Sequence, residues 1–168
     1  MTLFTLAAAP FIFENHLHRP TQDVGLYYLI LMLGVATGGM LANRLSRFVT
    51  LRTGLRIANA LAISGAGCFM LAELSGHLSV PTVVGSITLF MVGTGMASPF
   101  ALAGSVSANP QAIGAASGLY GFFQMGYGML CTIAIESWNP GSVLPVAIIL
   151  LSSTLASLCV LTWSARRA

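Results

Sequence analysis

Residues 39–56, GMLANRLSRFVTLRTGLR, contain four of the chain's seven arginines and no acidic residue. Long apolar segments lie on both sides of this stretch. A short basic loop between two such segments is typical of a cytoplasmic turn between two membrane helices, because loops rich in Lys and Arg stay on the cytoplasmic side. The stretch therefore predicts two membrane-spanning helices, and it orients the rest of the chain.

The composition indicates that the chain is surrounded largely by lipid. Of its 168 residues, 56% are hydrophobic and only 7% are charged, whereas a soluble domain has roughly 25% charged residues. A soluble fold with so few charges would expose far too much apolar surface. The net charge of +3 comes from arginines in one loop and at the C-terminus. Since the cytoplasmic preference of Arg explains this charge, no nucleic-acid partner is expected.

Six apolar segments follow one another along the chain. About 20 helical residues, each rising 1.5 Å, cross a hydrocarbon core of about 30 Å. The first segment is shorter and is expected to be the outer part of a truncated helix. The predicted fold is all-α, a polytopic bundle of about six transmembrane helices in a single domain, 1–168. The predicted spans are residues 1–13 (partial), 24–43, 55–74, 82–106, 111–135 and 143–164.

The arginine distribution predicts the orientation of all these spans. If loop 44–56 is cytoplasmic, alternation places the C-terminus in the cytoplasm as well. Six of the seven arginines then lie inside, and only Arg19 lies outside. The chain is therefore expected to be a multi-pass protein of the cell (inner) membrane. The same alternation places all four acids outside, namely Glu14, Asp23, Glu73 and Glu136.

Glycines at helical spacing predict close contacts between helices. Small residues three or four positions apart let another helix approach closely. In the fourth segment, Gly93, Gly95 and Pro99 predict a flexible or kinked centre. The glycines expected to pack are Gly34 and Gly38 in the second segment, and Gly114, Gly118, Gly121 and Gly128 in the fifth.

The fifth segment also has a polar and aromatic face. Tyr120, Gln124 and Tyr127 fall within about 60° of one another on a helix. A glutamine near the middle of a membrane is costly unless it finds a partner or faces water. Two interpretations are open: these side chains form hydrogen bonds between helices, or they form one wall of a substrate cavity.

The sequence offers little for catalysis or metal binding. No Asp, Glu, Lys, Arg or His lies near the middle of a complete span, although ion-coupled transport usually needs such a group. Every histidine precedes Ser117, so the order of a serine protease's nucleophile and base is missing. His16 and His18 beside Glu14 could bind a metal weakly, but exposed loop residues explain them as well. No enzyme activity, metal or cofactor is expected.

The arginine stretch resembles the signature loop of the major facilitator superfamily, whose pattern is G-x-L-A-D-R-x-G-R-[RK]. Asn43 replaces the acid of that pattern, Ser46 the glycine and Phe48 the basic residue. The fifth segment is similar to the eleventh helix of the drug/proton antiporter subgroup, and APFIFE to the end of its seventh. The positions that match the signature are Gly39, Leu41, Ala42, Arg44 and Arg47.

The resemblance implies the C-terminal half of a twelve-helix transporter that works by alternating access. It implies proton-driven efflux of drugs or metabolites, with Tyr120, Gln124 and Tyr127 in contact with a small-molecule substrate. Such a half is not expected to work alone and would need an N-terminal six-helix half or a second copy. The alternative is a non-transporting membrane assembly subunit or an inactive fragment. The resemblance assigns a cytoplasmic signature loop to Gly39, Asn43, Arg44 and Arg47.

Overall fold

The computed structural model describes residues 21–75, 79–108, 110–136 and 144–166. These residues are almost entirely helical and include no strand. A short 3-10 helix, η2 (Pro110–Ala112), joins two of the five long helices. All five are long and apolar enough to cross a membrane. The long helices are α2 (Thr21–Leu45), α3 (Leu51–Leu74), α4 (Val80–Ala108), α5 (Ile113–Glu136) and α6 (Leu144–Arg166).

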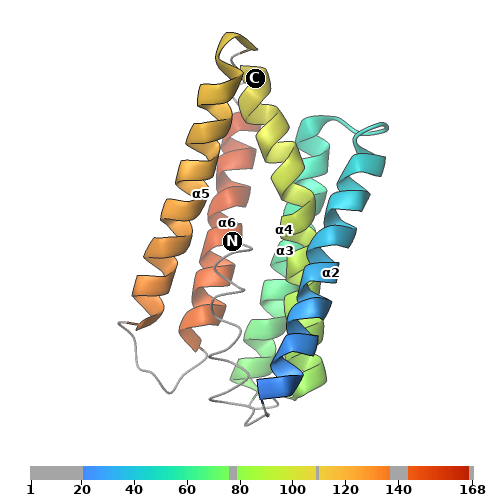
Figure 1. Ribbon diagram of the computed structural model, residues 1–168, viewed down its shortest axis with the longest axis vertical. Coiled ribbons are helices and arrows are strands. Elements are labelled where there is room, and N and C mark those ends of the chain that lie inside the picture. The colour runs from blue at the N-terminus through green and yellow to red at the C-terminus, as the bar shows by residue number, and fades with distance from the viewer. Residues whose placement is uncertain (1–20, 76–78, 109, 137–143, 167–168) are drawn as a thin grey trace.

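The predicted all-α fold is confirmed, and the chain is a multi-pass membrane protein. Each of the five predicted complete spans corresponds to one long helix. The predicted partial span, 1–13, lies outside the described residues. Figure 1 shows the helices running alternately up and down. The α2–α3 turn, the start of α5 and the end of α6 lie at one end of the bundle.

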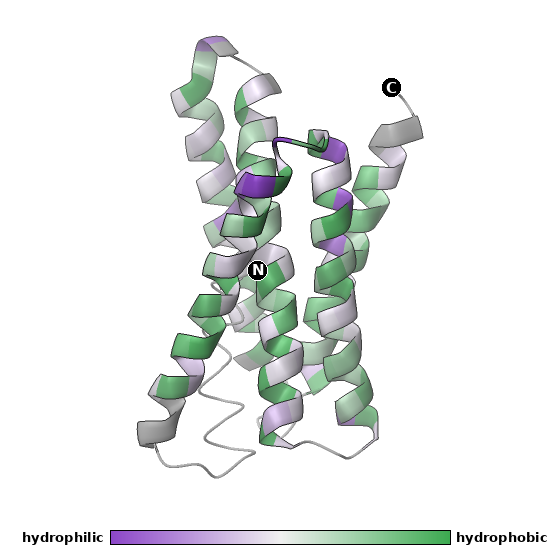
Figure 2. Cartoon of the chain, turned by 90° about the vertical axis from the view of Figure 1, so that its right-hand side faces the viewer, coloured by the Kyte–Doolittle hydropathy of each residue, from purple (hydrophilic) through white to green (hydrophobic). Residues whose placement is uncertain are grey.

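The basic stretch is a tighter turn than the predicted loop 44–56. Only residues 46–50 separate α2 from α3. Thr50 is the N-cap of α3, and its hydroxyl accepts a hydrogen bond from the backbone N–H of Thr53 at 3.4 Å. Such a cap satisfies a free donor at the helix start, which is why α3 begins at Leu51 and includes two of the arginines. Figure 2 shows hydrophilic residues gathered at this turn and on the start of α3.

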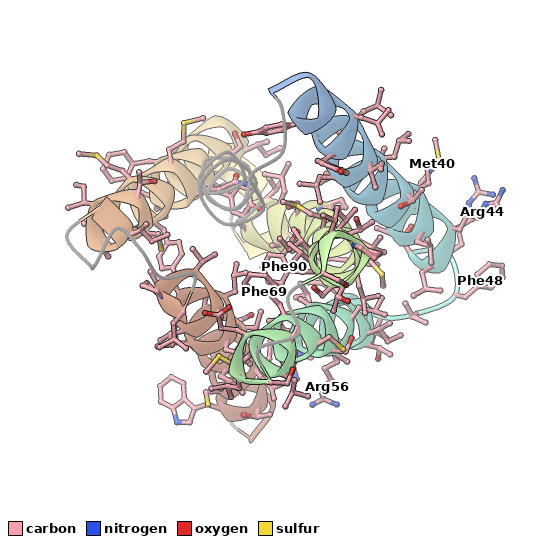
Figure 3. All side chains as sticks on the ribbon, turned by 90° about the horizontal axis from the view of Figure 1, so that it is seen from below. Met40, Arg44, Phe48, Arg56, Phe69 and Phe90 are labelled. Atoms are coloured by element: carbon pink, nitrogen blue, oxygen red, sulfur yellow. The ribbon has the colours of Figure 1, made fainter. Side chains whose placement is uncertain are left out.

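Helix α4 is the centre of the packing. It packs along α2 on one side and α3 on the other, whereas α6 packs mainly on α3. A helix that is apolar all round is expected to be buried, and 50% of the residues in an apolar 18-residue stretch of α4 are buried. Phe69 and Phe90 are completely buried in the core between these helices. Figure 3 shows both rings inside the bundle, whereas Arg44 and Phe48 point outward.

Glycines allow α4 to lie this close to both neighbours. A Cβ atom at Gly93 would lie 2.5 Å from the backbone N of Ala62 in α3. A Cβ atom at Gly95 would lie 2.4 Å from the carbonyl O of Val35 in α2. The segment predicted to be flexible or kinked is one unbroken helix that includes Pro99. Its two central glycines serve as contact points between helices.

Candidate functional site

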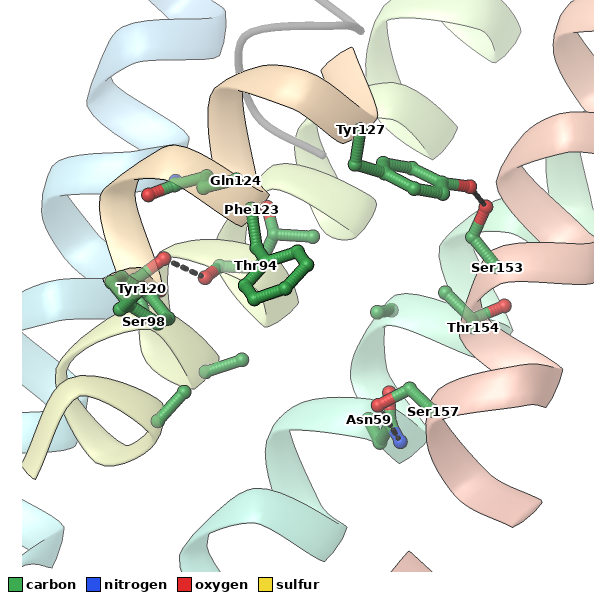
Figure 4. Close-up of a pocket in the computed structure, with 13 residues that line it drawn as sticks. Asn59, Thr94, Ser98, Tyr120, Phe123, Gln124, Tyr127, Ser153, Thr154 and Ser157 are labelled. Carbon is green, nitrogen blue, oxygen red and sulfur yellow. Dashed lines mark hydrogen bonds between the residues drawn. The ribbon is translucent and has the colours of Figure 1, made fainter. Parts of the chain in front are cut away.

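A pocket of about 340 Å³ lies between α3, α4, α5 and α6. Figure 4 shows polar side chains from these four helices directed toward it. Alanines and the ring of Phe123 supply its apolar surface. Its volume falls at the lower end of the range for small-molecule sites, which is about 300–1,000 Å³. The polar residues that line it are Asn59, Thr94, Ser98, Tyr120, Gln124, Tyr127, Ser153, Thr154 and Ser157.

The three residues predicted for a cavity wall all line this pocket. Tyr120, Gln124 and Tyr127 lie on one face of α5, because residues three and four apart on a helix are neighbours on its surface. The structure also places Phe123 beside them, and its ring meets that of Phe122 edge to face, with centroids 5.9 Å apart. The sequence therefore located one wall of the pocket, that of α5.

The two interpretations of this polar face apply to different residues. The hydroxyls of Tyr127 and Ser153 form a hydrogen bond between α5 and α6, in which either can donate. This is the interhelical bonding that one interpretation expected. Tyr120 and Gln124, in contrast, form no hydrogen bond with any other residue in the described ranges. Their polar groups lie at the pocket and can interact with a bound molecule.

Asn59 is a residue of this site that the sequence reasoning missed. It is only 6% exposed, and its side-chain N–H donates to the Ser157 hydroxyl at 3.0 Å. This bond joins α3 to α6 on one side of the pocket. An amide inside an apolar span is costly without a partner, so the lone asparagine of this segment was a usable signal.

Buried threonines also contribute to the lining. The Thr94 hydroxyl donates to the Met91 carbonyl at 3.2 Å, and the Thr154 hydroxyl donates to the Leu150 carbonyl at 3.1 Å. Hydroxyls in membrane helices commonly bond back to their own helix in this way. Both side chains therefore add polarity to the wall while their donors are already used.

The residues of the predicted signature loop lie apart from this pocket. Gly39, Asn43 and Arg44 lie in the last turns of α2, and Arg47 lies in the turn that follows. Asn43, Arg44 and Arg47 are exposed. None of the four lines the pocket between α3 and α6. Gly39 and Asn43 instead border a separate hollow between α2 and α4.

The glycines predicted to pack fall into two groups. Gly34 and Gly38 are buried where α2 meets α4. A Cβ atom at Gly38 would lie 2.2 Å from the Val92 carbonyl O. For the second group, no described atom outside the local helix backbone lies within 4 Å of an added Cβ. Close packing there stays a prediction: Gly114 and Gly118 are exposed, whereas Gly128 is already buried within the described bundle. This second group consists of Gly114, Gly118, Gly121 and Gly128.

Residues 21–75, 79–108, 110–136 and 144–166 contain no cluster of three or more His, Cys, Asp or Glu that could hold a metal. The weak candidate, Glu14 with His16 and His18, lies outside those ranges. None of the described residues that line the pocket carries a charged side chain. The arrangement can therefore bind a molecule by hydrogen bonds and apolar contact.

No protein-family model, curated protein or solved structure matches the chain.

Proposed function

We propose that the chain forms part of a small-molecule transporter of the major facilitator type. The observation that carries this proposal is a pocket with nine polar lining residues between helices of membrane-spanning length. Polar groups at membrane depth are costly and are commonly kept where they serve a substrate path. The proposed reaction is movement of a small drug or metabolite across the cell (inner) membrane by alternating access, driven by protons.

The uneven packing of the helices supports this mechanism. Helices α2, α3 and α4 pack tightly together, whereas α5 makes few contacts with α4 and α6. Alternating access requires one group of helices to rock against another around a fixed site. In our proposal α5 is the wall of the pocket that moves. Arg44 and Arg47, exposed near the α2–α3 turn, would control the cytoplasmic gate, with that turn and the C-terminus in the cytoplasm.

A partner unit is part of the proposal because no described helix covers one face of α5. Its large apolar side chains are exposed, as is Gly118. A glycine groove with room around it suits the close approach of another helix. We infer an N-terminal six-helix half or a second copy of the chain as that unit, with the ion-coupling groups in it. The exposed large side chains of α5 include Leu119, Phe122, Met125, Met129 and Leu130.

Transport in everted membrane vesicles tests the proposal. Vesicles from the chain's native cells, which would also supply the partner unit, should take up a radiolabelled antibiotic when a proton gradient is applied. Gln124→Leu should reduce this uptake about tenfold, as expected if one hydrogen bond in a partly dry site is lost. Equal uptake by vesicles that lack the chain would contradict the proposal.

The open glycine face of α5 favours one alternative, a non-transporting assembly subunit. In that case Gln124→Leu should leave the activity of any complex intact, whereas Gly118→Leu should break assembly. The transporter proposal expects both substitutions to reduce activity. Since an added Cβ at Gly118 meets no described atom of its own chain within 4 Å, failure of Gly118→Leu would report a lost partner. Cross-linking followed by size-exclusion chromatography measures assembly separately from activity.

A further inference from the structure

The residues around the pocket indicate what kind of molecule it accepts. The described residues of its polar lining supply hydroxyl groups and two amides, Asn59 and Gln124, and none of them carries a charge. Moving an ion from water into such a site costs far more than moving a neutral polar group, unless an opposite charge is present. The pocket therefore discriminates against charged ligands of either sign.

The free hydrogen-bonding groups are concentrated on one side of the pocket. The Asn59–Ser157 and Tyr127–Ser153 pairs already occupy groups on α3, α5 and α6. Gln124 offers two N–H donors and a carbonyl acceptor, and it forms no hydrogen bond with another described residue. The neighbouring Tyr120 hydroxyl is likewise not bonded within the described ranges. A ligand rich in hydroxyl groups would satisfy these two side chains.

An aromatic surface adjoins this polar side. Figure 4 shows the Phe123 ring between Gln124 and the Asn59–Ser157 pair. The edge-to-face contact with Phe122, at 72° between the ring planes, supports the orientation of that ring. Aromatic rings pack favourably against other rings in offset or edge arrangements. The ligand that fits has an apolar ring beside a polar, hydroxyl-bearing part.

Resting on the transporter role proposed above, we infer that the substrate is an uncharged molecule with an aromatic ring and several hydroxyl groups. The pocket volume of about 340 Å³ suits a small member of this class. Hydroxyl groups bind Tyr120 and Gln124, and the ring packs against Phe123. An aryl glycoside has this chemistry and serves as the probe.

Three matched probes test the inference on the purified full chain in lipid nanodiscs. They are 4-nitrophenyl glucoside, its glucuronide with a carboxylate, and its 6-amino-6-deoxy analogue with an ammonium group. Equilibrium dialysis measures the dissociation constant of each. The neutral glucoside should bind at least about tenfold more tightly than either charged probe. Equal or tighter binding of a charged probe overturns the inference, and so does binding of none of the three.

A charge introduced at Gln124 should change this preference in a defined direction. Gln124→Glu keeps the shape of the side chain but supplies a carboxylate. It should weaken binding of the glucoside and strengthen binding of the amino analogue, each about tenfold. Gln111→Glu is the matched control, because Gln111 is exposed and does not line the pocket. Circular dichroism verifies that both variants fold, and identical selectivity in both would overturn the inference.

Uptake into proteoliposomes separates this inference from the proposed function. Binding of the glucoside without gradient-driven uptake by the chain or its complex contradicts the transporter role and leaves the ligand class standing. Uptake of a charged probe in preference to the glucoside contradicts the ligand class and leaves the transporter role standing.

Discussion

Helices α4 and α5 are both glycine-rich and both long enough to cross a membrane, yet their glycines are used differently. In α4, Gly93 and Gly95 are pressed against the backbones of two neighbouring helices. In α5, an added Cβ at any of the five glycines would meet no described atom beyond its own helix backbone within 4 Å. In an apolar 18-residue stretch of each helix, 50% of the residues are buried in α4 and 11% in α5. Glycine spacing predicts a surface that can pack, but the neighbouring helices decide whether it does.

The largest expected effect comes from filling a packed glycine. Gly93→Ala should lower the free energy of unfolding by about 2–3 kcal/mol, because the added methyl meets backbone that cannot move aside. The clash would be with the Ala62 backbone, 2.5 Å away. Unfolding in mixed micelles at increasing SDS, followed by circular dichroism, measures the loss. A change below about 0.5 kcal/mol would mean that α3 and α4 are not packed as closely as described.

A smaller effect is expected where α6 is joined to the packed helices. Asn59→Leu removes the bond to Ser157 and should cost about 1 kcal/mol, which is typical of one interhelical hydrogen bond in a membrane. The same unfolding assay applies. Ser64→Ala is the control, since the exposed Ser64 hydroxyl bonds only to the Leu61 carbonyl of its own helix. Equal losses in both variants would show that the bond between helices contributes nothing.

The bond between α5 and α6 should contribute less. Tyr127→Phe removes the hydroxyl that meets Ser153, and we expect a loss of about 0.6 kcal/mol. Amide hydrogen exchange should increase in α5 while α4 stays protected, because α5 has few other contacts. An equal increase in amide exchange in both helices would show that α5 is no more loosely packed than α4.

The smallest effect is expected at an open glycine. Gly118→Ala should change the free energy of unfolding by less than about 0.5 kcal/mol, because a methyl group there meets only open space and alanine is the better helix former. Comparison with Gly93→Ala shows how the same change, glycine to alanine, affects the stability of a packed helix and of an open one. A loss of comparable size would show that α5 packs against another surface even in the purified chain.

Part of this architecture could be predicted from the sequence because it depends on local properties. Apolar length predicted the five helices, and helical spacing grouped Tyr120, Gln124 and Tyr127 on one face. Which neighbouring helix a given residue contacts depends on tertiary structure, and the sequence did not predict it. The sequence does not say that Gly93 meets α3 while Gly95 meets α2. Asn59 and Ser157 are 98 positions apart, so no local pattern predicts their hydrogen bond.

That long separation has a consequence for the order in which the protein matures. Helices α2, α3 and α4 are consecutive and can pack as soon as all three have left the ribosome. The Asn59 amide then waits, without its final partner, until α6 is synthesised. Contacts that close such long loops form late and slow folding, and incompletely packed intermediates are the ones most exposed to misassembly. Helix α6 thus completes a site that α3 begins. Newly made chains are most exposed to misassembly between the synthesis of these two helices.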